Sequence, residues 1–151
     1  MMALNLRAEA VLPCSLERAA AELDRLDGYP TWLGIVLAVE SCEPDATDTG
    51  PAWWVDLGGR LGPVSRTKRV RMVRTAHTER EIRFERGEID GRTHNRWVLE
   101  ARLTPEAEER TQVEMRVHYS GDRRVPVLDR VLRQEVSRAG RRLVDRVAEV
   151  G

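Results

Sequence analysis

The chain has 151 residues, of which 41% are hydrophobic and 33% are charged. This is the length of one ordinary domain, and the apolar fraction is enough for one core, so we expect a single domain over residues 1–151. The 25 basic and 25 acidic residues balance, which argues against a nucleic-acid-binding surface, because such a surface usually needs an excess of basic charge.

The two cysteines, Cys14 and Cys42, have neither the spacing of a disulfide framework nor that of a metal site. The sequence shows no apolar stretch of the kind found in a signal peptide or a membrane-spanning helix. These features predict free thiols in a reducing compartment, a cytoplasmic location and no integral membrane contact. The three histidines also lack metal-ligand spacing, so we expect no metal and no cofactor.

The N-terminal part of the chain predicts a strand followed by two short helices. Apolar and polar residues alternate from residue 3 to residue 12, which is the period of a half-buried strand. After Pro13, Ser15 is a suitable N-cap for a helix that runs to about Leu26. The segment 27–33 predicts a second, shorter helical turn after a break.

The middle of the chain alternates in polarity, and glycine, proline and acidic residues that favour turns separate its segments. Such segments are typical of antiparallel strands joined by hairpins. The last hairpin loop is expected over Pro105–Arg110, which is acidic and contains no large apolar residue. An apolar run from Trp32 to Val39 enters a strand that ends near Pro44, and an exposed loop follows over Glu43–Gly50. A break is expected at Gly62-Pro63, and a turn at Gly87 and Asp90-Gly91. The other expected strands are Ala52–Leu57, which ends at Gly58-Gly59, and then Val64–Ala76, Glu79–Glu85, Thr93–Thr104 and Thr111–Tyr119.

The segment Val125–Val150 predicts a long C-terminal helix. Pro126 lies near its start, where proline is tolerated, and at about 1.5 Å per residue the helix would be roughly 35–40 Å long. Aspartate and arginine residues fill one face, and apolar residues form a stripe on the other. The stripe consists of Val127, Leu128, Val131, Leu132, Val136, Ala139, Leu143, Val144 and Val147.

This order of elements resembles the START-like, or helix-grip, superfamily, which includes polyketide cyclases, plant pathogenesis-related allergens, and lipid- and quinone-binding proteins. The resemblance covers nearly the whole chain. It depends on the element order, on Pro13 and Ser15 before the first helix, on the segment Tyr29-Pro30-x-Trp32 and on the paired final strands. It implies an α+β fold in which a curved antiparallel sheet of about seven strands surrounds a long C-terminal helix, with two short helices after strand 1.

Four of the seven aromatic residues are tryptophans. Alternation along the strands places Trp53, Trp97 and Tyr119 on inward faces, whereas Trp54 should point outward or lie at the rim. Such residues suit ordinary core packing, and they also suit a cavity for a flat or elongated apolar ligand. The ligand-binding residues that we expect are Trp32, Trp53, Met72, Arg74, Trp97, Met115 and Tyr119.

The long strand Val64–Ala76 carries basic residues on both faces, and the sequence leaves open which face points inward. If Val70 and Met72 point inward, they share their face with three basic residues near the strand ends. A buried arginine needs a carboxylate or an acidic group of a ligand as its partner, whereas strand ends that protrude into water need none. The three basic residues are Arg66, Lys68 and Arg74.

Glu135 of the terminal helix is a candidate partner for such an arginine, because it borders the apolar stripe. Arg69 and Arg71 lie on the opposite face of the long strand and are expected to point outward. We expect His94 and His118 to be outward-facing as well, because they share parity with neighbouring arginines.

The leading hypothesis is a binding module that encloses an apolar small molecule, such as a lipid, a quinone or a polyketide-like compound, in a cavity between the sheet and the terminal helix. By resemblance, a polyketide cyclase or aromatase is an alternative, with Arg74, Tyr119 or Arg66 stabilising enolate charge. A protein-interaction module without a ligand is a third. The expected partner is thus an apolar small molecule, with a homodimer left open and no nucleic acid.

Overall fold

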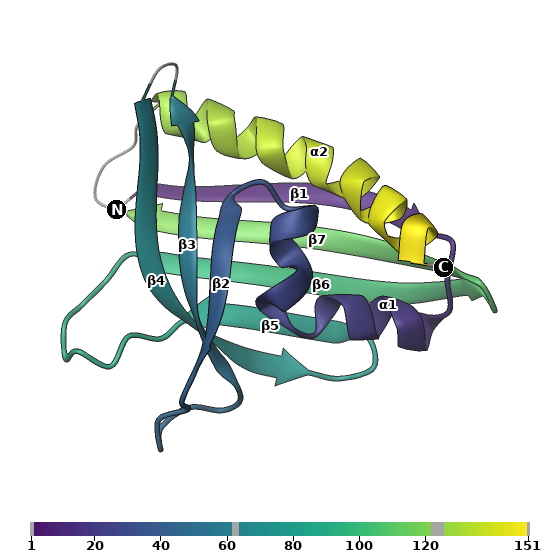
Figure 1. The fold of residues 1–151 in the computed structure, drawn as a ribbon, viewed down its shortest axis with the longest axis horizontal. Coiled ribbons are helices and arrows are strands. Elements are labelled where there is room, and N and C mark those ends of the chain that lie inside the picture. The colour runs from purple at the N-terminus through teal and green to yellow at the C-terminus, as the bar shows by residue number, and fades with distance from the viewer. Residues whose placement is uncertain (1, 62–63, 122–125, 151) are drawn as a thin grey trace.

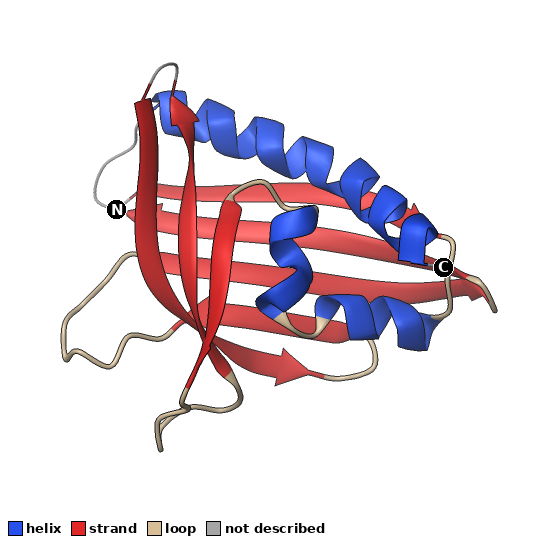
Figure 2. Cartoon of the chain, in the orientation of Figure 1, coloured by secondary structure: helices blue, strands red, loops and turns tan. Residues whose placement is uncertain are grey.

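The chain folds into a strongly curved antiparallel sheet with one long and two short helices on its concave side (Figures 1 and 2). The computed structural model describes residues 2–61, 64–121 and 126–150. In chain order the elements are β1 (Met2–Leu12), α1 (Leu16–Leu23), the 3-10 helix η1 (Leu26–Thr31), β2 (Val36–Cys42), β3 (Ala52–Leu61), β4 (Val64–His77), β5 (Glu81–Arg86), β6 (Arg96–Ala107), β7 (Arg110–Gly121) and α2 (Pro126–Val150).

The seven strands form one sheet in the order β1-β7-β6-β5-β4-β3-β2, and every neighbouring pair is antiparallel. The sheet bends so strongly that β2, β3 and β4 cross the direction of β1, β7 and β6 at a steep angle (Figure 1). Helix α2 packs along β1 and reaches β3 and η1, while α1 packs on β6 and β7. The predicted α+β class, with seven antiparallel strands and two short helices after the first, is confirmed.

Alternating polarity fixes which face of each strand is buried. In β1, Leu4, Leu6 and Leu12 are buried, whereas the intervening Asn5 and Arg7 are exposed. Successive side chains of the other strands also point to opposite faces, although some outward-facing residues, such as Arg71 and Val73 of β4, are buried as well. The inward side chains of all these strands join the inward residues of α1, η1 and α2 in one hydrophobic core.

Helix α1 begins where the sequence predicts, because the side-chain oxygen of Ser15 accepts a hydrogen bond of 3.2 Å from the backbone N–H of Arg18. It ends at Leu23, three residues before the predicted end. Arg25 has an extended backbone (φ −132°, ψ 140°), which breaks the helix before η1 begins at Leu26. The hydroxyl of Tyr29 donates to the carbonyl of Leu23 at 2.8 Å and so satisfies one of the open carbonyls at the helix end.

Two predicted strand ends are wrong. Gly58 and Gly59 do not end β3, because their backbone pairing with β4 continues to Leu61. The loop expected over Pro105–Arg110 is much shorter, because β6 extends to Ala107 and β7 begins at Arg110. A register shift between Pro105 and Ala107 accommodates the proline, which has no N–H to give to the ladder.

Other expected turns agree with the structure or lie outside it. Gly91, in the predicted Asp90-Gly91 turn, has a positive φ of 74°, a conformation that glycine adopts without strain. The expected break at Gly62-Pro63 lies outside the described residues. So do the expected first residue of the terminal helix, Val125, and the side chains of residues 127 and 128.

The C-terminal helix α2 buries its apolar stripe as predicted, with Leu132, Val136, Ala139, Leu143 and Val147 all in the core. Gly140 lies on the same face and lets the helix approach β1 closely. A Cβ atom at this position would lie 2.8 Å from the carbonyl oxygen of Glu9. Within the described ranges, no helix is both long and apolar enough to cross a membrane.

Replacing Gly140 with alanine tests this close approach. Alanine is normally better than glycine inside a helix by ~1 kcal/mol. Here we expect Gly140→Ala to lower the free energy of unfolding by about 1–2 kcal/mol, because α2 must move away from β1. Urea unfolding measures the change, and Ser137→Ala, at an exposed position of the same helix, should alter stability by less than about 0.5 kcal/mol. A stabilised Gly140→Ala variant would contradict the packing.

Candidate ligand-binding site

A row of inward-facing side chains crosses the concave face of the sheet from β3 to β1. Trp53 of β3 pairs with Met72 of β4, which pairs in turn with Arg86 of β5. The ladder between β5 and β6 ends at the pair of Glu85 and Val98, and Arg86 and Trp97 are the next residues along these two strands. The row continues from Trp97 to Tyr119 of β7 and to Leu4 of β1. Four of the ligand-binding residues expected from the sequence therefore lie along this row as two adjacent pairs, Trp53 with Met72 and Trp97 with Tyr119.

An aromatic cluster joins one end of this row to η1. The ring centroids of Tyr29 and Trp32 are 4.5 Å apart, and Phe84 stands edge-on to Tyr29 at 5.7 Å and to Trp53 at 5.5 Å. The indole N–H of Trp53 donates to Asp27 at 3.3 Å. Burial raises the pKa of Tyr29 above its ordinary value, so its hydroxyl stays protonated. Aromatic side chains with few polar contacts thus form this wall of the interior.

A second aromatic pair lies further along the row. The rings of Trp97 and Tyr119 are tilted at 44° with centroids 4.6 Å apart, and the Tyr119 hydroxyl accepts a hydrogen bond of 3.1 Å from the side-chain amide of Asn95. The indole N–H groups of Trp97 and Trp32 are buried, and neither has a hydrogen-bond acceptor in the part of the chain that the structure describes. A buried donor without an acceptor is costly, and native proteins contain few of them.

A charged pair sits in the middle of the row. The Arg86 side chain is only 5% exposed, and its Nε and Nη2 atoms lie 3.2 and 3.1 Å from one carboxylate oxygen of Glu88. Its Nη1 atom donates to the carbonyl of Asn95 at 3.3 Å. Arg86 is not among the ligand-binding residues expected from the sequence. The alternation along this strand does predict that Arg86 points inward, because Arg86 follows Ile82 and Phe84 at intervals of two and both of these are buried.

The other nominated residues lie elsewhere on the concave side. Met115 is buried opposite Ala8 and Ala101, four residues along β7 from Tyr119. Arg74 lies opposite Phe84, and its guanidinium donates to the carbonyl of Asp24 at 2.9 Å. Arg74 therefore ties the end of α1 to β4.

The structure settles which face of the long strand points inward. Val70 and Met72 are buried in the core, and Lys68 shares their face opposite the buried Leu57, although Lys68 itself is exposed. The side chain of Arg66 lies outside the described residues. Glu135, the expected partner of an inward arginine, instead forms ion pairs within its own helix, with Arg142 at 3.1 Å and Arg138 at 3.8 Å.

Arg71 points to the outer face of the sheet, as expected, but its side chain is buried there. Arg71 is on the outer face of β4 with Arg69, yet its side chain is 1% exposed because the segment 43–50 and the residues after β5 cover it. Its guanidinium donates to both carboxylate oxygens of Asp48, at 3.0 and 2.6 Å, and to the carbonyls of Gly87 and Glu43. Arg69, by contrast, is exposed and pairs with Glu40 and Asp56.

No family model and no curated protein matches the chain. Solved structures do match over almost its full length. A START superfamily protein from Mycobacterium smegmatis aligns with a TM-score of 0.72 at 11% identity, covering 97% of this chain and 99% of that one. The Zhui aromatase/cyclase from Streptomyces sp. R1128 aligns with a TM-score of 0.67 at 15% identity, over 98% and 95%. Major latex-like protein 151 from Panax ginseng aligns with a TM-score of 0.62 at 10% identity, over 97% and 98%.

The chain has the START-like helix-grip fold. At these identities the comparison establishes the fold alone, because proteins that share a fold can differ in the function of their sites.

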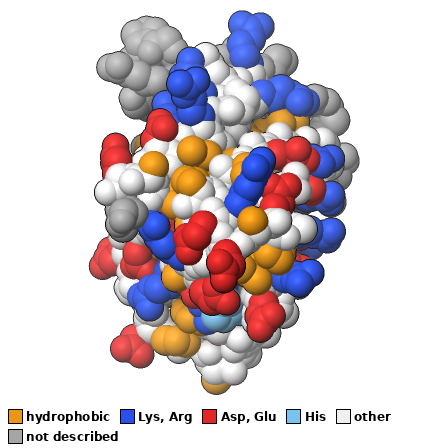
Figure 3. All heavy atoms as spheres, turned by 90° about the vertical axis from the view of Figure 1, so that its right-hand side faces the viewer, with side chains coloured by type: hydrophobic (Ala, Val, Ile, Leu, Met, Phe, Trp, Pro, Cys, Tyr) orange, Lys and Arg blue, Asp and Glu red, His pale blue; other side chains and the backbone are white. Residues whose placement is uncertain are grey.

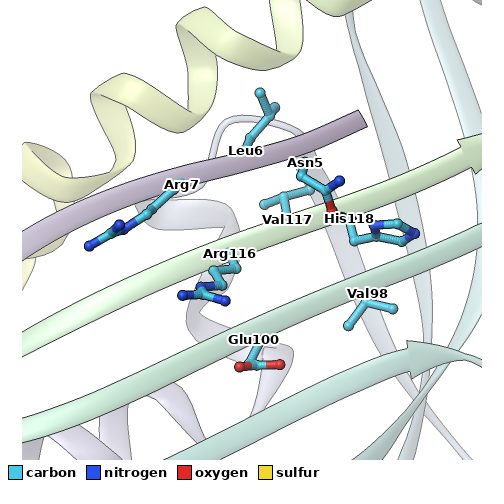
Figure 4. A pocket seen from close by; sticks show the side chains of 8 residues that line it. All are labelled: Asn5, Leu6, Arg7, Val98, Glu100, Arg116, Val117 and His118. Carbon is cyan, nitrogen blue, oxygen red and sulfur yellow. Dashed lines mark hydrogen bonds between the residues drawn. The ribbon is translucent and has the colours of Figure 1, made fainter. Parts of the chain in front are cut away.

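The convex side of this START-like sheet carries a wide groove of about 360 Å³ across β1, β7 and β6 (Figure 4). Charged side chains line it, and they pair with neighbouring residues: Arg7 and Arg116 both reach Glu114. His118 also faces this groove, as expected, with its Nδ1 atom 2.5 Å from the Asn5 side-chain oxygen. The groove therefore presents a surface whose charges are already matched.

His94 is partly exposed and pairs with Asp90 at 2.8 Å. On the face shown in Figure 3, basic and acidic side chains are intermingled. Among the described residues, no group of three histidine, cysteine, aspartate or glutamate side chains could hold a metal ion.

Replacing Asp48 with asparagine tests the buried pair on the outer face. The hydrogen bond from Arg71 lowers the pKa of Asp48. The pair therefore contributes stability above the unfolded-state pKa of about 3.9, and this contribution is lost as the pH falls through the folded-state pKa. We expect Asp48→Asn to lower the free energy of unfolding at neutral pH by about 3 kcal/mol, because it leaves the Arg71 charge buried without a carboxylate.

Urea unfolding of both proteins between pH 7 and pH 2 makes the measurement, and the difference should shrink towards acid pH. Asp56→Asn, which removes the partly exposed partner of Arg69, is the control and should cost less than about 1 kcal/mol. Equal losses for the two variants, or a difference that does not change with pH, would show that Arg71 and Asp48 do not form the buried pair described.

Proposed function

We propose that the protein binds a largely apolar small molecule, of the lipid, quinone or polyketide-like class, between the concave face of the sheet and α2. The binding residues are Trp32, Trp53, Met72, Trp97, Met115 and Tyr119. Arg74 supports the site by tying the end of α1 to β4 through the carbonyl of Asp24.

The observation that carries this proposal is the buried indole N–H of Trp97. It lies in the cross-sheet row, beside Tyr119, and has no acceptor among the described residues. Leaving a buried donor without a partner costs about 1–3 kcal/mol. A ligand that places an oxygen atom against this donor would recover that energy, and the aromatic rings around it would contact the ligand's apolar body.

The setting of the site supports the same function. Trp32 offers a second buried N–H without an acceptor among the described residues, and its ring belongs to the aromatic cluster with Tyr29. Two of the similar structures are those of a START superfamily protein and of an aromatase/cyclase. Cys14 and Cys42 are free thiols, which fits our expectation that the protein works in the reducing cytoplasm.

An enzyme of the polyketide cyclase or aromatase type is the second candidate. It is favoured by the Zhui structure and by the position of Tyr119, whose hydroxyl is held by Asn95 beside Trp97 and could contact a bound carbonyl compound. Such an enzyme would use the same interior, so ligand binding is the property that both candidates share.

A protein-interaction module gains less support. The large apolar side chains that are exposed among the described residues are Val11, Leu37 and Ile89, which belong to β1, β2 and the segment after β5. Single exposed apolar residues on separate elements are ordinary features of a protein surface.

Two naphthalene derivatives of similar shape test the proposal. Acetylnaphthalene carries a carbonyl oxygen, and ethylnaphthalene does not. We expect the protein to bind both, as measured by quenching of tryptophan fluorescence, and to prefer the ketone about tenfold, because its oxygen accepts from the buried donor. In Trp97→Phe the preference should disappear while the affinity for ethylnaphthalene changes little.

Trp53→Phe is the matched control. Trp53 lies in the same row, but its N–H already donates to Asp27, so this variant should retain the preference for the ketone. Failure of the native protein to bind either compound would refute the proposed function. Equal affinities for the two compounds would refute the role of Trp97.

A further inference from the structure

Lys68 is the only lysine in a chain with 25 basic residues. It projects from the concave face of β4, because it pairs with the buried Leu57 and shares the face of Val70 and Met72. At about 3.3 Å per residue, its backbone lies roughly 13 Å along the strand from Met72, the partner of Arg86. Lys68 and Arg86 thus place two cationic side chains on the same side of the sheet.

Among the described residues, Glu88 is the carboxylate close to these cations, and both of its oxygens accept hydrogen bonds. One oxygen of Glu88 accepts from Nε and Nη2 of Arg86, and the other accepts from the backbone N–H of Arg71 at 3.0 Å. Lys68 makes no hydrogen bond or ion pair with any residue that the structure describes. Among the described side chains at this place, Lys68, Arg86 and Glu88 together carry an excess of one positive charge.

Arg86 also has hydrogen-bonding capacity to spare. A guanidinium has five N–H groups, and the described residues engage three of those of Arg86, through Glu88 and the carbonyl of Asn95. The buried Arg71 on the outer face shows the contrast, because it has a bidentate carboxylate and two carbonyls. A buried guanidinium favours an anionic partner that uses its remaining donors.

The electrostatic state of Lys68 agrees with this excess of charge. Burial lowers the pKa of Lys68, the charge of Arg86 lowers it further, and Glu88 opposes the effect. A second anion near the two cations would remove the repulsion between them.

We propose that the ligand is an apolar acid, and that Lys68 and Arg86 bind its anionic group while the aromatic row from Trp53 to Tyr119 contacts its apolar body. This inference depends on the proposed function and narrows it, because it selects carboxylates and similar anions over neutral lipids and quinones. The anion lies beside Trp97, which like Arg86 is the next residue beyond the end of the ladder between β5 and β6, so one of its oxygens also accepts from the indole N–H.

Two fluorescent probes that share an aromatic body test the inference. Anilinonaphthalene sulfonate is an anion, and phenylnaphthylamine is the same framework without the sulfonate. We expect the native protein to bind the sulfonate about tenfold more tightly, in the range of one charge-assisted hydrogen bond. Lys68→Met should abolish that advantage and leave the affinity for phenylnaphthylamine unchanged, whereas Lys68→Arg should keep it.

Arg69→Met is the control, because it removes the same charge from the adjacent residue on the outer face, where Arg69 pairs with Glu40 and Asp56. Circular dichroism establishes that each variant is folded. Equal effects of Lys68→Met and Arg69→Met, or no effect of either, would overturn the inference while leaving the proposed function intact. Absence of binding of both probes to the native protein would overturn the two together.

Discussion

The contact between α2 and the concave face of the sheet is the constraint on which the rest of the structure depends. The apolar stripe of α2 must be buried, and it is buried mainly along β1, where Gly140 brings the helix against the backbone of Glu9. Because one helix cannot cover a curved seven-stranded sheet, α1 and η1 close a second part of the concave face. The row that contains Arg86, Trp97 and Tyr119 crosses the same concave face.

Charged side chains have different sets of partners on the two faces of the sheet. On the convex face, charged side chains pair with one another, as Arg7 and Arg116 do with Glu114. Even the buried Arg71 there donates four hydrogen bonds, two to Asp48 and two to backbone carbonyls. On the concave face, Arg86 is equally enclosed but has fewer acceptors among the described residues. This asymmetry favours a ligand site in the interior. The buried indole N–H of Trp97, which has no acceptor among the described residues, favours the same location.

Most of the fold could be predicted from the sequence because it depends on periodicity. The alternation of β1 and the stripe of α2 each report one buried face, and both predictions are confirmed. The errors arose where the backbone ladder overrode local signals. Gly58 and Gly59 favour a strand end in isolation, but their pairing with β4 holds them in the strand. Likewise, the end of α1 depends on the extended backbone of Arg25, and no pattern of side chains in the sequence predicts that conformation.

The candidate site was less predictable, because alternation gives the face of a residue but not what covers it. Arg71 points outward as expected, and only the path of the segment 43–50 makes it a buried residue. Arg86 could have been found by continuing the alternation of Ile82 and Phe84. Its pairing with Glu88, however, depends on how the chain leaves β5. The register between strands that are distant in sequence, which places Trp53 and Tyr119 in one row, is a property of the whole sheet.

The most direct test of ligand binding in the interior is the indole region of a proton–nitrogen NMR spectrum, in which the four tryptophans give four N–H signals. On saturation with acetylnaphthalene, the account predicts a shift of the Trp97 signal, because its N–H gains an acceptor. The signal of Trp54, on the outer face beneath the Arg69 guanidinium, should stay in place. A spectrum in which Trp97 does not move, or in which Trp54 alone responds, would contradict the account.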